Sequence, residues 1–237
     1  MISLITTYYN EPKHLIHLLE SECSDVFDEI IIVDDGSQRY PASNVVTSFT
    51  DDRIKLFRIK DDLGLNSHGA RNLAMKHCNS EWAYLTDIDR SGIGELASIV
   101  QRYVESARDK EYFKWYLSTE EQSINDYCIR VKDFWVSGGY DEEFVNYHYG
   151  DKMFIERLDQ YLYPTYIPYR IKPTRYARET KKANIQITEY PNDKILIEPK
   201  RDKSRKQKII DTVGWRNENP ELWIRDNILQ FDWEQLI

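Results

Sequence analysis

Two aspartates, Asp87 and Asp89, stand one residue apart at the end of the apolar run WAYLTDID. If this run is a β-strand, residues two apart point to the same side, so both carboxylates can converge on one point. Hard carboxylate oxygens in such a pair suit Mg²⁺ or Mn²⁺ bound jointly with phosphate oxygens and water. Asp-x-Asp triplets also occur by chance as ordinary surface carboxylates, so the neighbouring segments have to decide between the two interpretations.

The elements that would position this pair alternate in type along the first ninety residues. Short apolar, β-branched runs predict strands at 2–9, 29–35, 54–60 and 82–89. Helical patterns follow between them at 12–21, 41–49 and 67–78. This alternation predicts an α/β fold with a mainly parallel central sheet flanked by helices. Ligands of such sheets bind at the carboxyl ends of the strands, which are here the polar segments 7–10, 34–37 and 87–89.

Two further features of this half carry chemistry. In VDDGS, Asp34 and Asp35 end a predicted strand and Gly36 suits a tight turn, although these residue types also favour turns without any function. Arg71 falls near the start of a predicted helix, where the helix dipole disfavours a positive charge. Its presence there indicates an anionic partner such as a diphosphate, with an ion pair to Asp61 or Asp62 as the alternative.

The rest of the chain has a looser pattern. Helices are predicted at 94–108 and 150–162, strands at 113–118 and 127–136, a turn at 138–144 and an amphipathic stretch at 221–237. Residues 90–95 are expected to form a mobile loop with Gly92 and Gly94 as hinges. We expect a catalytic domain at 1–175, divided into a nucleotide-binding half at 1–90 and an acceptor half at 91–175, and a C-terminal extension at 176–237.

Composition limits the function classes. The 237 residues are 41% hydrophobic and 30% charged, which predicts a globular protein, and the net charge of -8 argues against a nucleic-acid binder. No basic leader and no apolar run of about 18 to 20 residues is present, so a cytoplasmic location is expected. The basic segment 181–208 is either a solvated linker or a peripheral contact with a membrane or acceptor.

Five segments, taken in order, carry a resemblance to a known family. TTYYNEP, IIIVDDGS, GLNSHGARNLAM, WAYLTDID and FWVSGGYDEEF followed by YGDKMFIERL resemble GT-A fold glycosyltransferases of the inverting family 2 type. The later part is also similar to β-1,4-galactosyltransferase relatives. The resemblance covers about residues 1–160. It implies metal-dependent, inverting transfer of a hexose from a nucleotide diphosphate sugar, with UDP as the preferred nucleotide, to an acceptor hydroxyl on a glycan, lipid or protein.

The resemblance also implies residue roles. It assigns nucleotide-sugar binding to Thr7, Tyr9, Asn10, Asp34, Asp35, Arg71 and Asp87. The cation, Mn²⁺ or Mg²⁺, falls to the DXD residues Asp87 and Asp89. Asp151 matches the catalytic base, with a simple helix N-cap as the alternative.

This chain departs from the family at two points. Gly150 stands where the family often has glutamate, and no histidine follows Asp151 to serve as a further metal ligand. Unless His148 or a later carboxylate substitutes, the cation would be held by the DXD pair and the diphosphate alone.

Two other functions remain as alternatives. One is a catalytically inactive module that binds a sugar nucleotide or a carbohydrate, which both departures favour. The other is a sugar nucleotidyltransferase, although TTYYNEPKH lacks the glycine-rich, basic loop that such enzymes need after the first strand. A homo-oligomer is compatible with either, and the sequence does not identify the acceptor.

Overall fold

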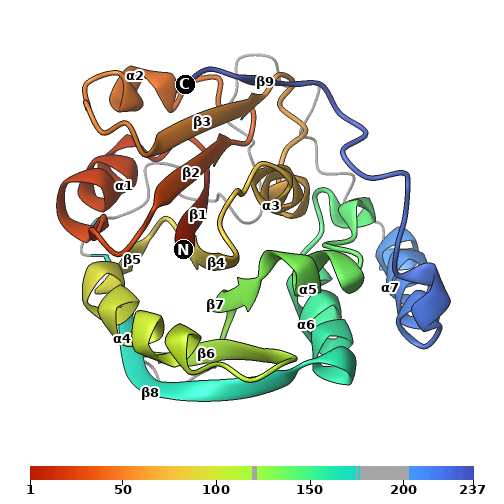
Figure 1. Cartoon of the computed structure of the whole chain (residues 1–237). Helices are drawn as coiled ribbons and strands as arrows, with labels where there is room; N and C mark the ends of the chain where they lie inside the picture. Colours follow the sequence, from red (N-terminus) through yellow and green to blue (C-terminus); the bar gives the residue numbers. More distant parts are fainter. Residues whose placement is uncertain (119–121, 175, 177–202) are drawn as a thin grey trace.

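The fold is built on one twisted sheet with helices on both faces. A computed structural model describes residues 1–118, 122–174, 176 and 203–237. Within these residues nine strands form a sheet in the order β5-β8-β6-β7-β4-β1-β2-β3-β9 (Figure 1). The strands are β1 (Ile2–Tyr8), β2 (Glu29–Asp34), β3 (Ile54–Ile59), β4 (Trp82–Asp87), β5 (Arg90–Ser91), β6 (Glu111–Leu117), β7 (Gln122–Arg130), β8 (Tyr163–Pro173) and β9 (Trp233–Gln235).

The helices include several short turns. The α-helices are α1 (Pro12–His17), α2 (Ser43–Val46), α3 (Ser67–Lys76), α4 (Ile93–Glu105), α5 (Val131–Val136), α6 (Gly150–Tyr161) and α7 (Lys203–Asn217). A π-helical turn, η1 (Leu18–Glu22), continues α1, and two 3-10 turns, η2 (Glu142–Phe144) and η3 (Pro220–Leu222), lie nearer the C-terminus.

The first four strands that the sequence predicts are present, and they pair in parallel. β1 lies between β2 and β4, and β3 follows β2. In this register Thr7 is level with both Val33 and Asp87, so the polar strand ends meet at one edge of the sheet. Beyond β4 the pairing changes, because β7 runs antiparallel to β4 and β6 antiparallel to β7. The sheet is therefore mixed, with the expected parallel order confined mainly to the N-terminal half.

Both faces of the parallel strands are buried, as a parallel sheet requires. In β2, Ile30 and Ile32 belong to one core and Ile31 and Val33 to the other, because successive side chains alternate between the faces. The first core is covered by α1, α2 and α4, and the second by α3, α5 and α6, on opposite sides of the sheet (Figure 1).

Two local predictions are wrong. The second half of the expected strand at 127–136 is the helix α5, whose Phe134 is fully buried in the second core, because tertiary packing outweighs the weak local pattern. The expected mobile loop at 90–95 is instead β5 and the start of α4. The Glu22 carboxylate accepts hydrogen bonds from the backbone N–H groups of Gly92, Ile93 and Gly94, which fixes this segment.

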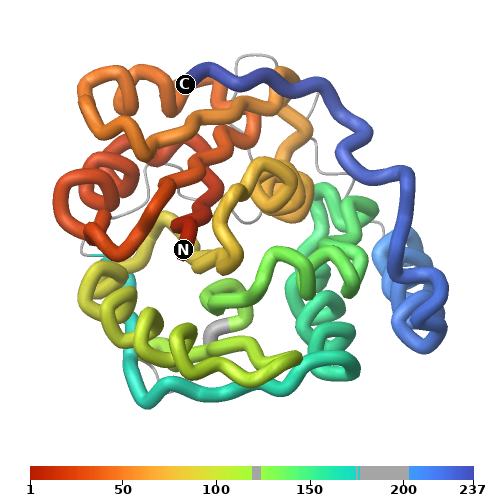
Figure 2. The backbone as a smooth tube through the Cα atoms, viewed as in Figure 1, coloured from red at the N-terminus to blue at the C-terminus, as the bar shows by residue number. Residues whose placement is uncertain are grey.

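The described part of the C-terminal extension returns to the body. Helix α7 packs on α6 through Val213 and Met153, and the chain then crosses to the edge of the sheet, where β9 pairs antiparallel with β3 (Figure 2). The amphipathic stretch at 221–237 thus forms mostly extended chain. The basic segment 181–208 lies outside the described residues as far as 202. Within the described residues no helix combines the length and apolar character needed to span a bilayer.

Candidate active site

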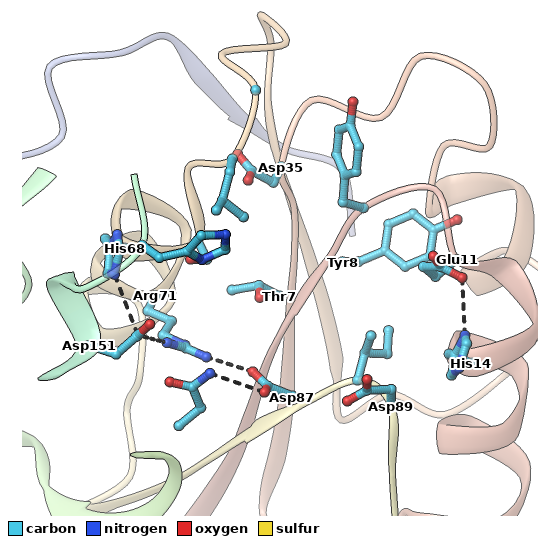
Figure 3. Close-up of a pocket in the computed structure, with 17 residues that line it drawn as sticks. Thr7, Tyr8, Glu11, His14, Asp35, His68, Arg71, Asp87, Asp89 and Asp151 are labelled. Carbon is cyan, nitrogen blue, oxygen red and sulfur yellow. Dashed lines mark hydrogen bonds and ion pairs between the residues drawn. The ribbon is translucent and has the colours of Figure 1, made fainter. Parts of the chain in front are cut away.

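A cavity of about 210 Å³ opens at the carboxyl ends of β1, β2 and β4. This volume is below the roughly 300–1,000 Å³ of typical ligand sites, so a nucleotide diphosphate sugar would fill it and project from it. Seven of the nine residues predicted for the site line the cavity: Thr7, Tyr9, Asp35, Arg71, Asp87, Asp89 and Asp151. In Figure 3, Asp151 and Arg71 lie on the left of the cavity and Glu11 and His14 on the right. Asp35 lies at the top of the view, between these two pairs.

Asp34 and Asn10 are the two predicted residues that do not line the cavity. The two carboxylate oxygens of Asp34 accept hydrogen bonds from the backbone N–H groups of Ser37 and Ala42, at 2.8 Å each. The Asn10 side-chain oxygen accepts from the N–H groups of Arg39 and Tyr40. Both side chains therefore hold the loop after β2 in place. Their predicted contact with a nucleotide stays a prediction.

Asp35 is the member of the VDDGS pair that faces the cavity. Its Oδ2 accepts a hydrogen bond from the Asn66 backbone N–H at 2.9 Å. Its Oδ1 is buried and has no hydrogen-bond partner among the described residues. Burial raises the pKa of Asp35 well above its ordinary value. A buried carboxyl oxygen without a protein partner is costly, so this geometry suits a ligand that hydrogen-bonds to it.

Arg71 joins two of the predicted carboxylates. Its Nη2 lies 2.7 Å from Asp87 Oδ1 and its Nη1 2.5 Å from Asp151 Oδ1. The arginine side chain is 3% exposed. Burial opposes its charge, but Tyr140 and the carboxylates of Asp151 and Asp87 outweigh this and hold the pKa of Arg71 well above its ordinary value. Neither Asp61 nor Asp62 is among its ion-pair partners in the described part of the chain.

Arg90 forms a second bridge at the same edge. It contacts Asp87 Oδ2 at 2.9 Å, Asp89 Oδ1 at 2.6 Å and Asp126 Oδ2 at 3.0 Å. The amide of Asn125 adds a hydrogen bond to Asp87 Oδ2 at 3.1 Å. With Asp151 included, the four side chains Asp87, Asp89, Asp126 and Asp151 are linked through Arg71 and Arg90 in one cluster.

The carboxylate oxygens of Asp87 and Asp89 are ligands of the kind that Mg²⁺ and Mn²⁺ prefer. The DXD pair does not form a closed protein cage, however. Among the described residues no group of three or more His, Cys, Asp or Glu side chains is arranged to hold a metal ion. The residues therefore fit a cation that is shared with a diphosphate and water. Arg90 contacts both members of the pair, and Arg71 contacts Asp87 as well, so both carboxylates are engaged by arginine.

Sequence reasoning missed several residues that line the cavity or pair with its carboxylates. Arg90 directly follows the DXD triplet and could have been noticed as its charge partner. Asn125 arrives from β7, an antiparallel strand whose position could not be predicted. His14 and Glu11 form a buried pair at 3.2 Å, three residues apart at the start of α1. His68 also lines the cavity, and its ring reaches Asp151. His148 lines the cavity too, and its suggested role as a ligand stays a prediction.

Comparisons with known proteins agree with this description. Residues 3–91 match the family model described as Glycosyl transferase family 2. TarS of S. aureus, residues 1–349, has the same fold with a TM-score of 0.62 and 16% identity over 73% of this chain and 60% of that one. Its complex with UDP-GlcNAc gives 0.63 and 16%, over 75% and 59%.

An archaeal structure has the same fold. The mannosyltransferase PcManGT from Pyrobaculum calidifontis, solved with GDP-Man and Mn²⁺, has a TM-score of 0.58 and 15% identity over 75% of this chain and 58% of that one. This chain thus spans about 60% of the length of the TarS fragment and less of PcManGT. No curated protein matches the chain in sequence.

Proposed function

We propose that this chain, whose residues 3–91 match the Glycosyl transferase family 2 model and whose fold is GT-A, transfers a hexose from a nucleotide diphosphate sugar to an acceptor hydroxyl. One observation carries the proposal. Asp35, Arg71, the DXD pair and Asp151 come from four separate segments of the chain, yet all line one cavity at the carboxyl edge of the sheet. Such an edge is where α/β sheets bind nucleotides.

The donor would lie across the cavity from Asp35 towards Arg71. Asp35 would offer a carboxyl oxygen to an N–H group of the nucleotide base. Tyr9 lines the same cavity, and its hydroxyl donates to Asp62 Oδ2 at 2.9 Å. The diphosphate would take up position at Arg71 and the DXD pair, where it completes the cation site. A bound cation supplies charge neutralisation to the leaving diphosphate. UDP is the preferred nucleotide, since TarS was solved with UDP and UDP-GlcNAc.

Asp151 would act on the acceptor. Burial by itself raises a carboxyl pKa, but His68 and Arg71 outweigh it and hold the pKa of Asp151 well below its ordinary value. The carboxylate is therefore charged in the free protein, and it becomes a stronger base when the diphosphate draws Arg71 away from it. As the acceptor oxygen bonds to the anomeric carbon, Asp151 takes the hydroxyl proton and the bond to the diphosphate breaks. A single displacement of this kind inverts the anomeric configuration.

A second candidate is a nucleotide-sugar-binding protein without turnover. It is favoured by the ion pairs that engage Asp87 and Asp151, because a base paired with Arg71 at 2.5 Å must exchange that partner before it accepts a proton. In the proposed enzyme the incoming diphosphate pairs with Arg71 and weakens the ion pair between Arg71 and Asp151. In the second candidate the ion pair persists.

The test is hydrolysis of a donor panel that includes UDP-GlcNAc, UDP-glucose and GDP-mannose, with Mn²⁺ present. We expect release of nucleoside diphosphate by the wild type and a loss of about 100-fold or more in Asp89→Ala and in Asp151→Ala. Asp52→Asn, at an exposed position, is the control. Binding without turnover would favour the second candidate. Pyrophosphate release from a nucleoside triphosphate and a sugar phosphate would identify a nucleotidyltransferase and overturn the proposal.

A further inference from the structure

The glycine at position 150 is explained by a histidine from another helix. Gly150 begins α6, and a Cβ built on it would lie 2.7 Å from Nε2 and 2.8 Å from Cε1 of His68. It would also lie 3.0 Å from Phe144. Real Cβ contacts are not this short, so a glutamate at this position would have to displace the imidazole. The His68 ring thus occupies the space where the resembling family places a carboxylate.

His68 is held tightly in this place. It lies in the first turn of α3 and is 1% exposed. Its ring centroid is 5.4 Å from that of Tyr140 and 6.1 Å from that of Phe144. Packing between aromatic rings fixes the plane of the imidazole, and Gly150 leaves its edge open towards Asp151. Both ring nitrogens are buried without a hydrogen-bond partner among the described residues, and the charged group that faces Nε2 is the Asp151 carboxylate.

The contact joins His68 Nε2 to Asp151 Oδ1 at 3.5 Å. Because a carboxylate only accepts hydrogen bonds, the nitrogen that faces it carries the proton. The distance is long for a hydrogen bond, and contacts of catalytic groups commonly shorten when the substrate binds. The same Oδ1 atom also accepts from Arg71. Both donors therefore converge on one oxygen, and no protein donor to Oδ2 is found among the described residues.

We propose that His68 is a positioning residue for Asp151. This inference rests on the proposed role of Asp151 as the base. Two donors on Oδ1 fix the plane of the carboxylate and leave Oδ2 for the acceptor hydroxyl. His68 keeps this orientation when the diphosphate draws Arg71 away. An imidazole from α3 thus replaces the second carboxylate of the family motif, and the loss of glutamate at position 150 does not disable the site.

The decisive comparison is between two substitutions at position 68. His68→Gln keeps an N–H donor near the place of Nε2, whereas His68→Met keeps the bulk and removes the donor. We expect kcat to fall about 100-fold in His68→Met and about 10-fold or less in His68→Gln, because loss of orientation is costly. The donor KM and the affinity for UDP or GDP should stay within about twofold of the wild type, because in this proposal His68 acts on Asp151 and not on the nucleotide.

The matched control is His77→Gln. His77 follows the end of the same helix and stacks on Phe57 at 4.5 Å, outside the cavity. It should retain wild-type kcat. An equal loss of kcat in His68→Met and His68→Gln would mean that His68 only fills space, and it would overturn the inference. Wild-type kcat in His68→Met would also overturn it. If His68→Met does not fold, His68→Asn replaces it in the comparison, because the shorter amide of asparagine does not reach Asp151. A kcat of His68→Asn equal to that of His68→Gln would again overturn the inference.

Asp151→Asn separates this inference from the proposed function. Full turnover in Asp151→Asn would show that Asp151 is not the base. A residue that positions Asp151 would then have no role in catalysis. Loss of turnover in Asp151→Asn together with wild-type turnover in His68→Met would overturn the role of His68 alone. The expected result is loss in both, with His68→Gln intermediate.

Discussion

The two ends of the cavity hold their carboxylates in different ways. At the Asp35 end, the partner is a backbone N–H group, and burial raises the pKa of the carboxyl. At the Asp151 end, burial acts in the same direction, but His68 and Arg71 outweigh it and lower the pKa. The same residue type therefore has a raised pKa at one end of the cavity and a lowered pKa at the other. The difference lies in the neighbours, because both side chains are largely removed from water.

The largest expected effect separates chemistry from recognition. Asp151→Asn should lower turnover about 1,000-fold, because the amide cannot accept the hydroxyl proton, and should leave the affinity for nucleotide nearly unchanged. Steady-state kinetics and calorimetric titration with UDP or GDP would measure the two effects. Glu156→Gln on the exposed side of α6 is the control. If Asp151→Asn lost nucleotide affinity as strongly as it loses turnover, the Asp151 end of the cavity would contribute to nucleotide binding as well as to chemistry.

The next effect concerns stability. Arg71→Ala leaves Asp87 and Asp151 without their shared cation and should lower the free energy of unfolding by about 3 kcal/mol. Urea denaturation would measure it. The exposed Arg102 of α4 is the control, and Arg102→Ala should stay within about 0.5 kcal/mol of the wild type. An equally small change in Arg71→Ala would show that the pairing at the Asp151 end contributes little to folding.

Substitution at the Asp35 end should act on binding. Asp35→Asn keeps the shape of the side chain and its bond from Asn66, but exchanges one oxygen for a donor. We expect the Kd for nucleotide to rise about 10- to 100-fold, the cost of one lost hydrogen bond to a buried carboxyl. Titration calorimetry would check it. Unchanged affinity would place the nucleotide base elsewhere.

The two ends should also differ in the sign of their pH dependence. The folded pKa of Asp35 is raised, so its contribution to stability is full below the ordinary carboxyl pKa and is lost as pH rises through the raised value. The folded pKa of Asp151 is lowered, so its contribution is present above the ordinary pKa and is lost as pH falls. As pH rises from about 4 to about 8, the Tm of Asp35→Asn should rise relative to the wild type, whereas the Tm of Asp151→Asn should fall relative to the wild type as pH rises towards about 4 and should then stay level.

The smallest effect compares two glycines in helices. Gly150→Ala would force a Cβ against His68 and should cost about 1 kcal/mol or more, despite the better helix propensity of alanine. Gly214→Ala in α7 meets only Met153 at 3.8 Å and should be neutral or stabilising by up to about 1 kcal/mol. Thermal unfolding of both variants would measure the difference. Equal Tm values would remove the packing argument for His68.

Much of the nucleotide-binding half could be predicted from sequence. The strands at 2–9, 29–35, 54–60 and 82–89 and the meeting of their polar ends follow from local periodicity and from the rules for parallel sheets. Asp35 could not be separated from Asp34, because the two share the same turn and only the packed loop decides which carboxylate faces the cavity.

The contacts of the C-terminal extension could not be predicted from the sequence. Its Arg216 and Arg225 both reach the buried Asp141, which also pairs with Arg157. These contacts span more than seventy residues of sequence and anchor the turn that precedes Asp151. No local pattern indicates them, because each residue taken alone is an ordinary surface charge.

The order of strands and helices in the N-terminal half, and the presence of acidic residues at its strand ends, are properties of the sequence by itself, since they arise from backbone periodicity and short-range turn chemistry. Tertiary structure alone decided which of these carboxylates are paired with arginine, which are buried without a partner, and which gap a histidine fills. Those outcomes depend on side chains that meet across large sequence separations, where charge and volume are balanced only after the chain has packed.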